Sequence, residues 1–572
     1  MTNAESDTLT NGRESGRSAD MILTNARLWG GIADDADRPP RAVAIGDGRV
    51  LALGAEEEIM PRGHRDTKVI DLHGARVVPG LIDSHLHAIR GASSYIDEVE
   101  WNAIRTLQDG LATISAAAAE RGPGAWILVL GGWYPAQLTD EPRMPTPTEL
   151  TAAAPDNPVF VHPLYGHDDH AVLNARALDA LGWADACPDP AGGTLDRDAA
   201  GRPTGVVRGL PAYALIASLA APTDLAREVE SSRLFFQRMA AVGLTGVVDA
   251  GGLGMSPDKY QAVRALWRQG RLPIRVRTNL CPVTRGNEPA EVETWEQMLE
   301  PALGDEILAV LGLGEVVHFG CHDWEGMVPF PITDEAFTAF VESLRATARR
   351  RWPVTIHAIL ESSISKVLDG IEAVAEQTPI DSLRWNLCHA ECISATDLAR
   401  VKRLGLGLAI QGRLSQKMNV IASRWGEDTA RDLLPLGQIR RLGIPFGAGT
   451  DGTRAGSYNP WQSLWYLITG RNVSGGPLRD AANRLSRPEA LDAYTRGSAW
   501  FSFEDDIRGV LRPGSLADLA VLDSDYFTVP DEEIPLLASN LTLVAGRIVH
   551  RSGPFADLPL QDHDPRPGPQ PL

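Results

Sequence analysis

Short apolar runs and longer amphipathic stretches alternate through the middle of the chain. Seven runs are typical of buried strands and begin at Thr245, Ile274, Leu311, Val354, Arg384, Leu406 and Pro445. An eighth candidate strand ends at His87. Two intervening stretches place apolar residues on one face of a helix: Leu225, Val229, Phe236 and Met239, then Phe337, Val341, Leu344 and Ala348. Eight strand–helix units predict an α/β fold, a TIM-type (β/α)₈ barrel.

The two ends of the chain have a different pattern of apolar and polar residues. Residues 21–79 consist of short strand-like runs broken by Gly, Asp or Asn, and a similar pattern returns in residues 500–555. We expect these pieces to pair into one small β domain beside a barrel of residues 80–499, with two separate β appendages as the alternative. Residues 98–220 are too long for a simple loop and predict an inserted subdomain over the barrel mouth. Residues 1–20 and 556–572 have the composition of disordered tails.

Charge and cysteine usage narrow the function classes. The 572 residues carry a net charge of −20 without a concentrated basic patch, which argues against nucleic acid or an anionic membrane as partner. Five cysteines without a CxxC pair indicate a reducing compartment, so we expect a cytoplasmic protein. No secretory signal or membrane-spanning run is apparent from the sequence. A small-molecule partner is therefore expected, and a homodimer is the default assembly.

Polar residues recur at the predicted carboxyl ends of strands, where such barrels place their active sites. These candidates are His85, His87, Glu315, His357, His389 and Asp451. Imidazoles and carboxylates suit Zn²⁺ or a related divalent cation, one or two per chain, which activates water near neutral pH. Asp451 is the candidate catalytic acid/base as well as a ligand. The alternatives are surface or core histidines, a turn role for Asp451 and a structural ion pair for Glu315.

Several motifs together resemble the metal-dependent amidohydrolase superfamily, and within it amidohydrolase family 3, which includes N-substituted formamide deformylase-like proteins. They are VPGLIDSHLH, VTIHA, NLCHA, GAGTDG and GVLRPGSLADLAVLD. The resemblance implies a distorted (β/α)₈ barrel with a β-sandwich built from both chain ends. It also implies that His85 and His87 bind the more buried metal, that His357 and His389 bind the second, and that Asp451 is a ligand and general acid/base.

The chain departs from this family pattern in the fourth strand. Many members carry a carboxylated lysine there, whereas LGLGEVVHF has none, so Glu315 could bridge the metals directly. Because the strand register is open, His318 or His322 could approach instead. Substrate-binding candidates in and near the insertion are Trp133, Tyr134, His170 and Trp324. Ordinary packing of an inserted subdomain is the alternative for these residues.

Three functions compete. The first is a metal-dependent hydrolase that cleaves an amide, N-formyl or carbamate bond with metal-activated hydroxide. The second is a one-metal deaminase of a small heterocycle. Glu361 follows His357 by four residues where such enzymes usually use three, which counts against it, whereas Glu391 follows His389 closely. The third is a non-catalytic binding protein, which would have no need of the full ligand set.

Overall fold

The computed structural model describes residues 18–31, 40–164, 170–185, 187–220, 224–252, 254–323, 328–473 and 475–565. Five β-sheets organise these residues. Two are parallel sheets in the middle of the chain, one belongs to the insertion, and two are formed by strands near the chain ends.

Eight parallel strands form the two central sheets, in the orders β15-β14-β13-β7 and β16-β17-β18-β19. Their bounds are β7 Leu81–Leu86, β13 Leu244–Asp249, β14 Arg275–Leu280, β15 Leu308–Leu313, β16 Thr355–Ala358, β17 Asn386–His389, β18 Gly407–Gln411 and β19 Phe446–Gly449. The eight expected strands are thereby confirmed. The fourth begins three residues earlier than the apolar run suggested, so Glu315 lies just beyond its end.

Backbone contacts join the two central sheets along both of their seams. On one side, Leu313 pairs with Val354 in an isolated parallel bridge between β15 and the start of β16. On the other side, the Asp451 N–H after β19 donates to the His85 carbonyl of β7 at 2.9 Å. Among the described residues, continuous strand ladders do not cross either seam.

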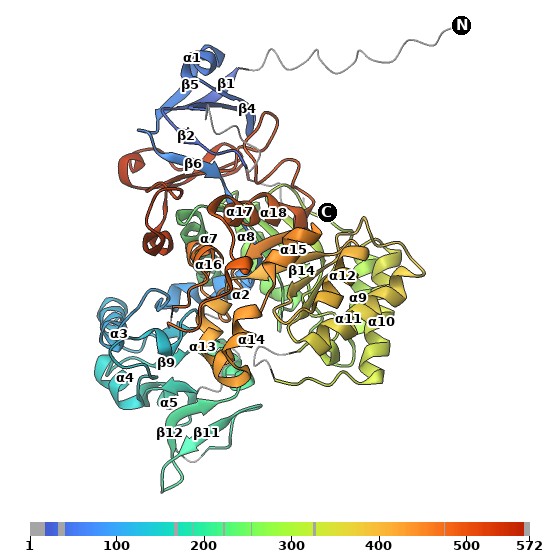
Figure 1. Ribbon diagram of the computed structural model, residues 1–572. Coiled ribbons are helices and arrows are strands. Elements are labelled where there is room, and N and C mark those ends of the chain that lie inside the picture. The colour runs from blue at the N-terminus through green and yellow to red at the C-terminus, as the bar shows by residue number, and fades with distance from the viewer. Residues whose placement is uncertain are drawn as a thin grey trace, which may run out of the picture.

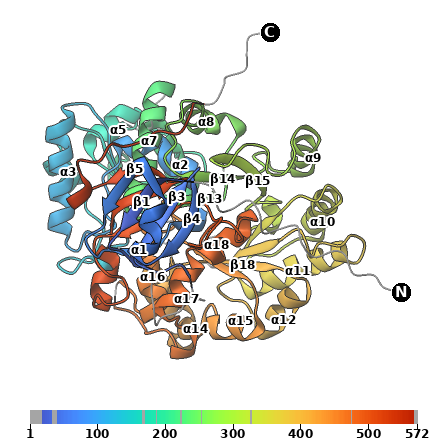
Figure 2. The same cartoon turned by 90° about the horizontal axis from the view of Figure 1, so that it is seen from above.

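Helices follow most of these strands and lie in an arc around them (Figure 2). They are α2 Ala88–Ser94, α7 Leu225–Ala241, α8 Gln261–Arg268, α9 Glu288–Met298, α10 Asp334–Arg349, α11 Glu361–Ala375, α12 Ala395–Arg403, α13 Leu414–Trp425, α14 Glu427–Asp432, α15 Leu436–Leu442, α16 Pro460–Thr469, α17 Arg487–Ala493 and α18 Arg496–Ala499. The two helices expected from periodicity are α7 and α10. Helix α10 begins where the Thr333 hydroxyl accepts from Ala336 N–H, and it buries Val341 and Leu344. None of the described helices combines the length and apolarity needed to cross a membrane.

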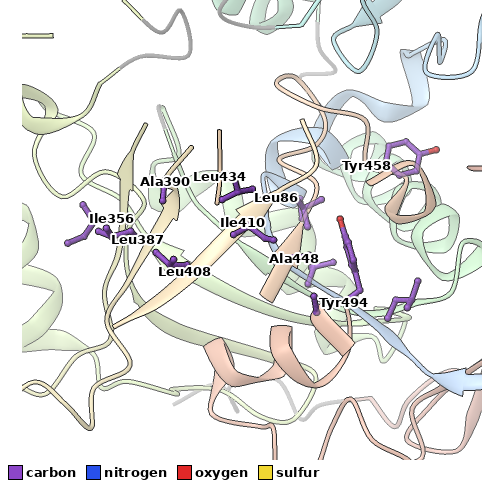
Figure 3. Packing of buried hydrophobic residues seen from close by; sticks show 14 of the residues in the cluster. Leu86, Ile356, Leu387, Ala390, Leu408, Ile410, Leu434, Ala448, Tyr458 and Tyr494 are labelled. Atoms are coloured by element: carbon purple, nitrogen blue, oxygen red, sulfur yellow. The ribbon is translucent and has the colours of Figure 1, made fainter. Parts of the chain in front are cut away.

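Apolar side chains on the central strands alternate with polar ones. Ile356, Leu387 and Leu408 on neighbouring strands are almost fully buried and belong to one large core cluster (Figure 3). Because successive side chains of a strand point to opposite faces, His357 on β16 points away from Ile356. In the same way, Leu86 on β7 packs into the core, whereas its sequence neighbours His85 and His87 point to the other side. The apolar pattern that builds the core thus directs the polar residues to the other side.

Strands from both chain ends pair with one another at one end of the molecule (Figure 1). One sheet contains β2 Arg27–Leu28, β6 Arg76–Pro79, β20 Leu519–Leu522, β21 Ser539–Val544 and β22 Arg547–Arg551; the other contains β1 Ala19–Thr24, β3 Ala42–Gly46, β4 Arg49–Gly54 and β5 Gly63–Asp71, with the short helix α1 Glu56–Ile59. Strand β6 pairs antiparallel with β20, and one core cluster draws on both ends. Strand β1 begins inside the predicted leader, and His563 in the predicted tail donates its N–H to Gly270 O at 2.8 Å.

The expected insertion has its own sheet, in the order β11-β12-β10-β9-β8. Its elements are β8 Ile127–Leu130, β9 Val159–His162, β10 Ala171–Leu173, β11 Thr194–Arg197 and β12 Pro203–Arg208, with helices α3 Leu107–Arg121, α4 Pro147–Ala153, α5 Ala175–Leu181 and α6 Leu210–Ala220. It lies at the opposite end of the molecule from the strands of the chain ends (Figure 1). A core of its own includes Trp101 and Trp133.

Candidate metal centre

His85 and His87 lie at the end of β7, on the same side of the strand, and both are buried. The preceding carboxylate, Asp83, fixes this segment, because it accepts from the His85 N–H at 2.9 Å and from the Thr450 hydroxyl at 2.6 Å. Burial raises the pKa of Asp83 to about 7, against the opposing effect of these hydrogen bonds. His87 Nδ1 lies 3.0 Å from the carbonyl of Gly251, which directs Nε2 toward the centre of the site.

The Glu315 carboxylate lies at the centre of the cluster. Its Oε2 is 3.3 Å from His85 Nε2, 3.2 Å from His357 Nδ1 and 3.3 Å from His389 Nε2. Its Oε1 is 3.4 Å from His87 Nε2. Burial alone would raise the pKa of Glu315, but hydrogen bonds from the imidazoles, His357 first, outweigh it and hold the pKa well below its ordinary value.

His357 lies between two buried carboxylates. Its Nδ1 faces Glu315, and its Nε2 lies 3.2 Å from Oδ1 of Asp323. Asp323 is itself held by the backbone N–H groups of Ile359 and Leu360. Burial alone would lower the pKa of His357, but hydrogen bonds to Asp323 and Glu315 raise it to about 10. Two carboxylates thus attract positive charge to this position, which either a proton or a metal ion can supply.

Asp451 and His389 both leave their strands in a left-handed backbone conformation. Their φ angles are 58° and 71°, which is uncommon for residues other than glycine. Asp451 Oδ1 lies 3.3 Å from His87 Nε2, while Oδ2 lies 2.9 Å from Arg413 Nη1. Burial would raise the pKa of Asp451, but the nearby His87 imidazole and the charge of Arg413 outweigh it and lower the pKa strongly.

Arg413 connects this acid to a second buried carboxylate. Its Nε and Nη2 donate to the two oxygens of Glu391 at 2.7 and 2.9 Å, in addition to its contact with Asp451. All three side chains are at most 2% exposed. A bidentate pair of this kind fixes the guanidinium plane, which in turn holds Asp451 Oδ2.

The donor set fits a divalent cation. Two groups of buried donor atoms lie within 4.8 Å of one another: His85, His87 and Asp451 form the first, and His85, Glu315, Cys388 and His389 the second. His85 Nε2 and Asp451 Oδ1 are buried and have no hydrogen-bond partner of acceptable geometry within the described parts of the chain. Buried polar atoms without partners are costly, and coordination of a cation would satisfy both.

Comparison with known proteins decides the family. The model of the amidohydrolase family matches residues 68–550. The chain belongs to the amidohydrolase family. This amidohydrolase is similar to an N-substituted formamide deformylase of Arthrobacter pascens, with 27% identity over 92% of this chain and 97% of the relative. Family membership makes it an enzyme of the class that hydrolyses carbon–nitrogen bonds other than peptide bonds.

Solved structures support the fold of this amidohydrolase. A metal-dependent hydrolase from Pyrococcus horikoshii superposes with a TM-score of 0.64 at 20% identity, covering 90% of this chain and 99% of that one. A metal-dependent hydrolase from Pyrococcus furiosus superposes with a TM-score of 0.63 at 21% identity, covering 89% and 100%. At such identities the likeness concerns the fold alone.

The amidohydrolase brings all of its sequence-predicted ligand candidates into one cluster: His85, His87, Glu315, His357, His389 and Asp451. Of the two histidines considered in place of Glu315, His318 lies outside this cluster and His322 lies beside it. His318 Nε2 lies 3.9 Å from Glu288, and the His322 ring packs against His357 at 3.8 Å between centroids. Glu361, whose spacing from His357 was compared with the deaminase pattern, is exposed at the start of α11.

Sequence reasoning missed Asp323, Cys388 and Arg413, and it considered Glu391 only for the deaminase alternative. Cys388 and Glu391 flank the predicted ligand His389, so proximity in the sequence was an available signal. Asp323 and Arg413 lie in connections after strands, and their roles depend on side-chain directions that periodicity does not specify.

The predicted substrate-binding residues have different environments. Trp133 is fully buried in the insertion core, where its ring contacts Trp101 and its Nε1 donates to the His162 carbonyl, as expected for ordinary packing. Tyr134 and His170 are partly exposed. Trp324 lies outside the described residues.

The turn before Trp133 connects the insertion to the site. The Gly132 carbonyl accepts from Gln416 Nε2 at 2.9 Å. Gly131 has φ +65°, and a Cβ there would lie 2.5 Å from the carbonyl oxygen of Arg454, three residues after Asp451. Only glycine permits this approach, so the insertion packs directly against the rim of the metal centre.

Proposed function

We propose that this amidohydrolase uses a bound divalent cation, Zn²⁺ first, to hydrolyse an amide, N-formyl or carbamate bond of a small molecule. The observation that carries the proposal is the Glu315 carboxylate at the centre of four imidazoles. Burying carboxylates and histidines costs free energy, which indicates that these residues bind a cation or take part in catalysis. The similarity to a formamide deformylase supports the N-formyl class as the first to test.

The proposed architecture places this site at the mouth of a distorted (β/α)₈ barrel. The contacts of Leu313 with Val354 and of Asp451 with His85 support closure of the two parallel sheets into one barrel of residues 80–499. The insertion of residues 98–220 would cover its mouth. The paired strands of residues 21–79 and 500–555 would form the small β-sandwich.

In the proposed centre, His85, His87 and Asp451 would hold one cation, His357 and His389 would hold a second, and Glu315 would be a ligand for both. Glu315 would thereby take the place of a carboxylated lysine without any modification. When bound, the cations polarise the substrate carbonyl and lower the pKa of water, which makes it a nucleophile at neutral pH. Asp323 would orient His357 by accepting from its Nε2.

Asp451 is the proposed proton carrier. Its carboxylate would take the proton of the attacking water and pass it to the departing nitrogen, so that the leaving group departs as a neutral amine. Arg413 would hold the carboxylate in place through Oδ2 and leave Oδ1 facing the imidazoles. Tyr134, His170 and Trp324 are proposed to contact the substrate, whereas Trp133 packs within the insertion core.

The test is amine release from matched panels of N-formyl amines, simple amides and carbamates. We expect metal-loaded protein to release amine from at least one class, and Asp451→Asn to lower kcat by about 10²–10⁴-fold. Asp179→Asn, which changes an exposed carboxylate on α5, is the matched control and should leave kcat unchanged. Ammonia release from an amidine-like heterocycle, without hydrolysis of any of the three panels, would replace this proposal with the deaminase.

A further inference from the structure

A cysteine thiol lies among the proposed ligands. Cys388 on β17 is fully buried, and its Sγ lies 3.6 Å from Glu315 Oε2. The same oxygen is in contact with His85 and His389. Within this group, one donor atom of each of the four residues lies within 4.8 Å of the others.

The backbone explains why two consecutive residues of one strand face the same site. In an extended strand, Cys388 and His389 would point to opposite sides. His389 has φ +71° and Ala390 has φ +51°, so the strand turns into left-handed backbone at its end. This turn brings the imidazole back to the side that Cys388 faces. Non-glycine residues in this conformation are strained, and such strain concentrates at functional sites.

The distances measured from Glu315 Oε2 match those of a coordination shell. With Zn–N and Zn–O bonds of about 2.1 Å and a Zn–S bond of about 2.3 Å, tetrahedral ligands lie about 3.4 Å apart for N and O and about 3.6 Å apart for S and O. Around the second cation of the proposed centre, Glu315 Oε2 lies 3.3 Å from His389 Nε2 and 3.6 Å from Cys388 Sγ. The Oε2–Sγ distance exceeds the Oε2–Nε2 distance by about the amount expected when sulfur replaces nitrogen as a ligand of tetrahedral zinc.

We propose that Cys388 is a thiolate ligand of the second cation of the metal centre, beside His389 and Glu315, and that it biases the site toward Zn²⁺ over harder cations such as Mn²⁺ and Mg²⁺. The inference rests on the proposed function, because it concerns the same metal centre. Thiolate is a soft ligand that favours zinc, whereas carboxylate and water ligands accept the hard cations equally well. On coordination the S–H bond breaks, sulfur keeps the electron pair, and the proton leaves to solvent.

Cys281 provides a matched comparison within the chain. It is also buried and follows β14, a strand of the other central sheet, but its Sγ lies 3.5 Å from the carbonyl of Pro282. It does not belong to either donor group found among the described residues. Replacement of its sulfur should therefore change packing without changing the metal.

The experiment replaces the native metal of the full-length protein with Co²⁺ and records the electronic absorption spectrum. Coordinated thiolate gives an intense sulfur-to-cobalt charge-transfer band in the near ultraviolet, separate from the weak visible bands of any bound Co²⁺. We expect the charge-transfer band in wild type and in Cys281→Ser and its loss in Cys388→Ser. Zn²⁺ affinity of Cys388→Ser should fall by at least the roughly 10–100-fold that outer-shell losses cost, and its preference for Zn²⁺ over Mn²⁺ should narrow.

The outcomes separate this inference from the function on which it rests. Visible bands without a charge-transfer band in wild type would overturn the thiolate ligand and leave the metal hydrolase intact. A charge-transfer band that survives in Cys388→Ser would overturn the assignment to this sulfur. Wild-type protein that binds no Co²⁺ or Zn²⁺ would overturn both proposals.

Discussion

At the scale of single residues, the second partner of each ligand determines its direction. His87 is oriented by the Gly251 carbonyl, and His357 by Asp323. Asp451 is held by Arg413, whose position is set by Glu391. The sequence revealed the ligands because histidines and carboxylates that recur at the carboxyl ends of barrel strands are typical of a metal site. It did not reveal these partners, because the sequence does not indicate whether an aspartate or arginine in a connecting segment faces solvent or a ligand.

Asp323 provides a direct test of orientation at this scale. Asp323→Asn removes the charge that faces His357 Nε2 while it keeps an oxygen for the N–H groups of Ile359 and Leu360. We expect the Zn²⁺ affinity to fall by about 10–100-fold, the usual effect of losing an outer-shell carboxylate. Titration against a competing chelator measures this change, with circular dichroism as the check on folding. Asp369→Asn, at an exposed position of α11, is the control, and an unchanged affinity in Asp323→Asn would refute the role of Asp323.

At the scale of elements, the hydrophobic pattern predicted the existence and order of the central strands but not their ends. The fourth strand ends at Leu313, and the residues after it carry Glu315 into the site. Strand β17 ends in left-handed backbone at His389, which no periodicity signals. The contact of Gly131 with Arg454 was equally hidden, because it joins segments more than 300 residues apart. Strand ends depend on tertiary contacts, whereas strand interiors depend on local alternation.

At the scale of the whole molecule, buried ion pairs tie the central sheets to the strands of the chain ends. Asp518, just before β20, forms a bidentate pair with Arg275 on β14, with distances of 2.7 and 3.0 Å. Arg508 Nε approaches the same carboxylate at 3.3 Å. These three side chains are almost fully buried, so loss of one partner leaves uncompensated charge. The composite β region is thus held to the central parallel strands by electrostatics as well as by packing.

Asp518→Asn should therefore lower the free energy of unfolding by about 3–5 kcal/mol near neutral pH. Burial would raise the pKa of Asp518, but Arg275 outweighs it and lowers the pKa below its unfolded value. The carboxylate's contribution is then fully present above about pH 4 and is lost as the pH falls through the lowered pKa. Urea unfolding of wild type and Asp518→Asn from pH 7 downward measures this contribution. The difference between their free energies of unfolding should shrink only in the acidic range. Asp66→Asn, the control at an exposed ion pair, should lower the free energy of unfolding by no more than about 1 kcal/mol. If the difference in unfolding free energy between wild type and Asp518→Asn grew on acidification, this role of Asp518 would be contradicted.

Elemental analysis of metal per chain shows whether Glu315 and the surrounding imidazoles form a metal centre. The comparison uses wild type, Glu315→Ala and, as a matched control, Glu361→Ala at the exposed start of α11. We predict about two divalent ions per chain in wild type and in the control, and fewer in Glu315→Ala. Wild-type protein without metal after reconstitution, or a Glu315→Ala variant with an unchanged metal content, would contradict the account.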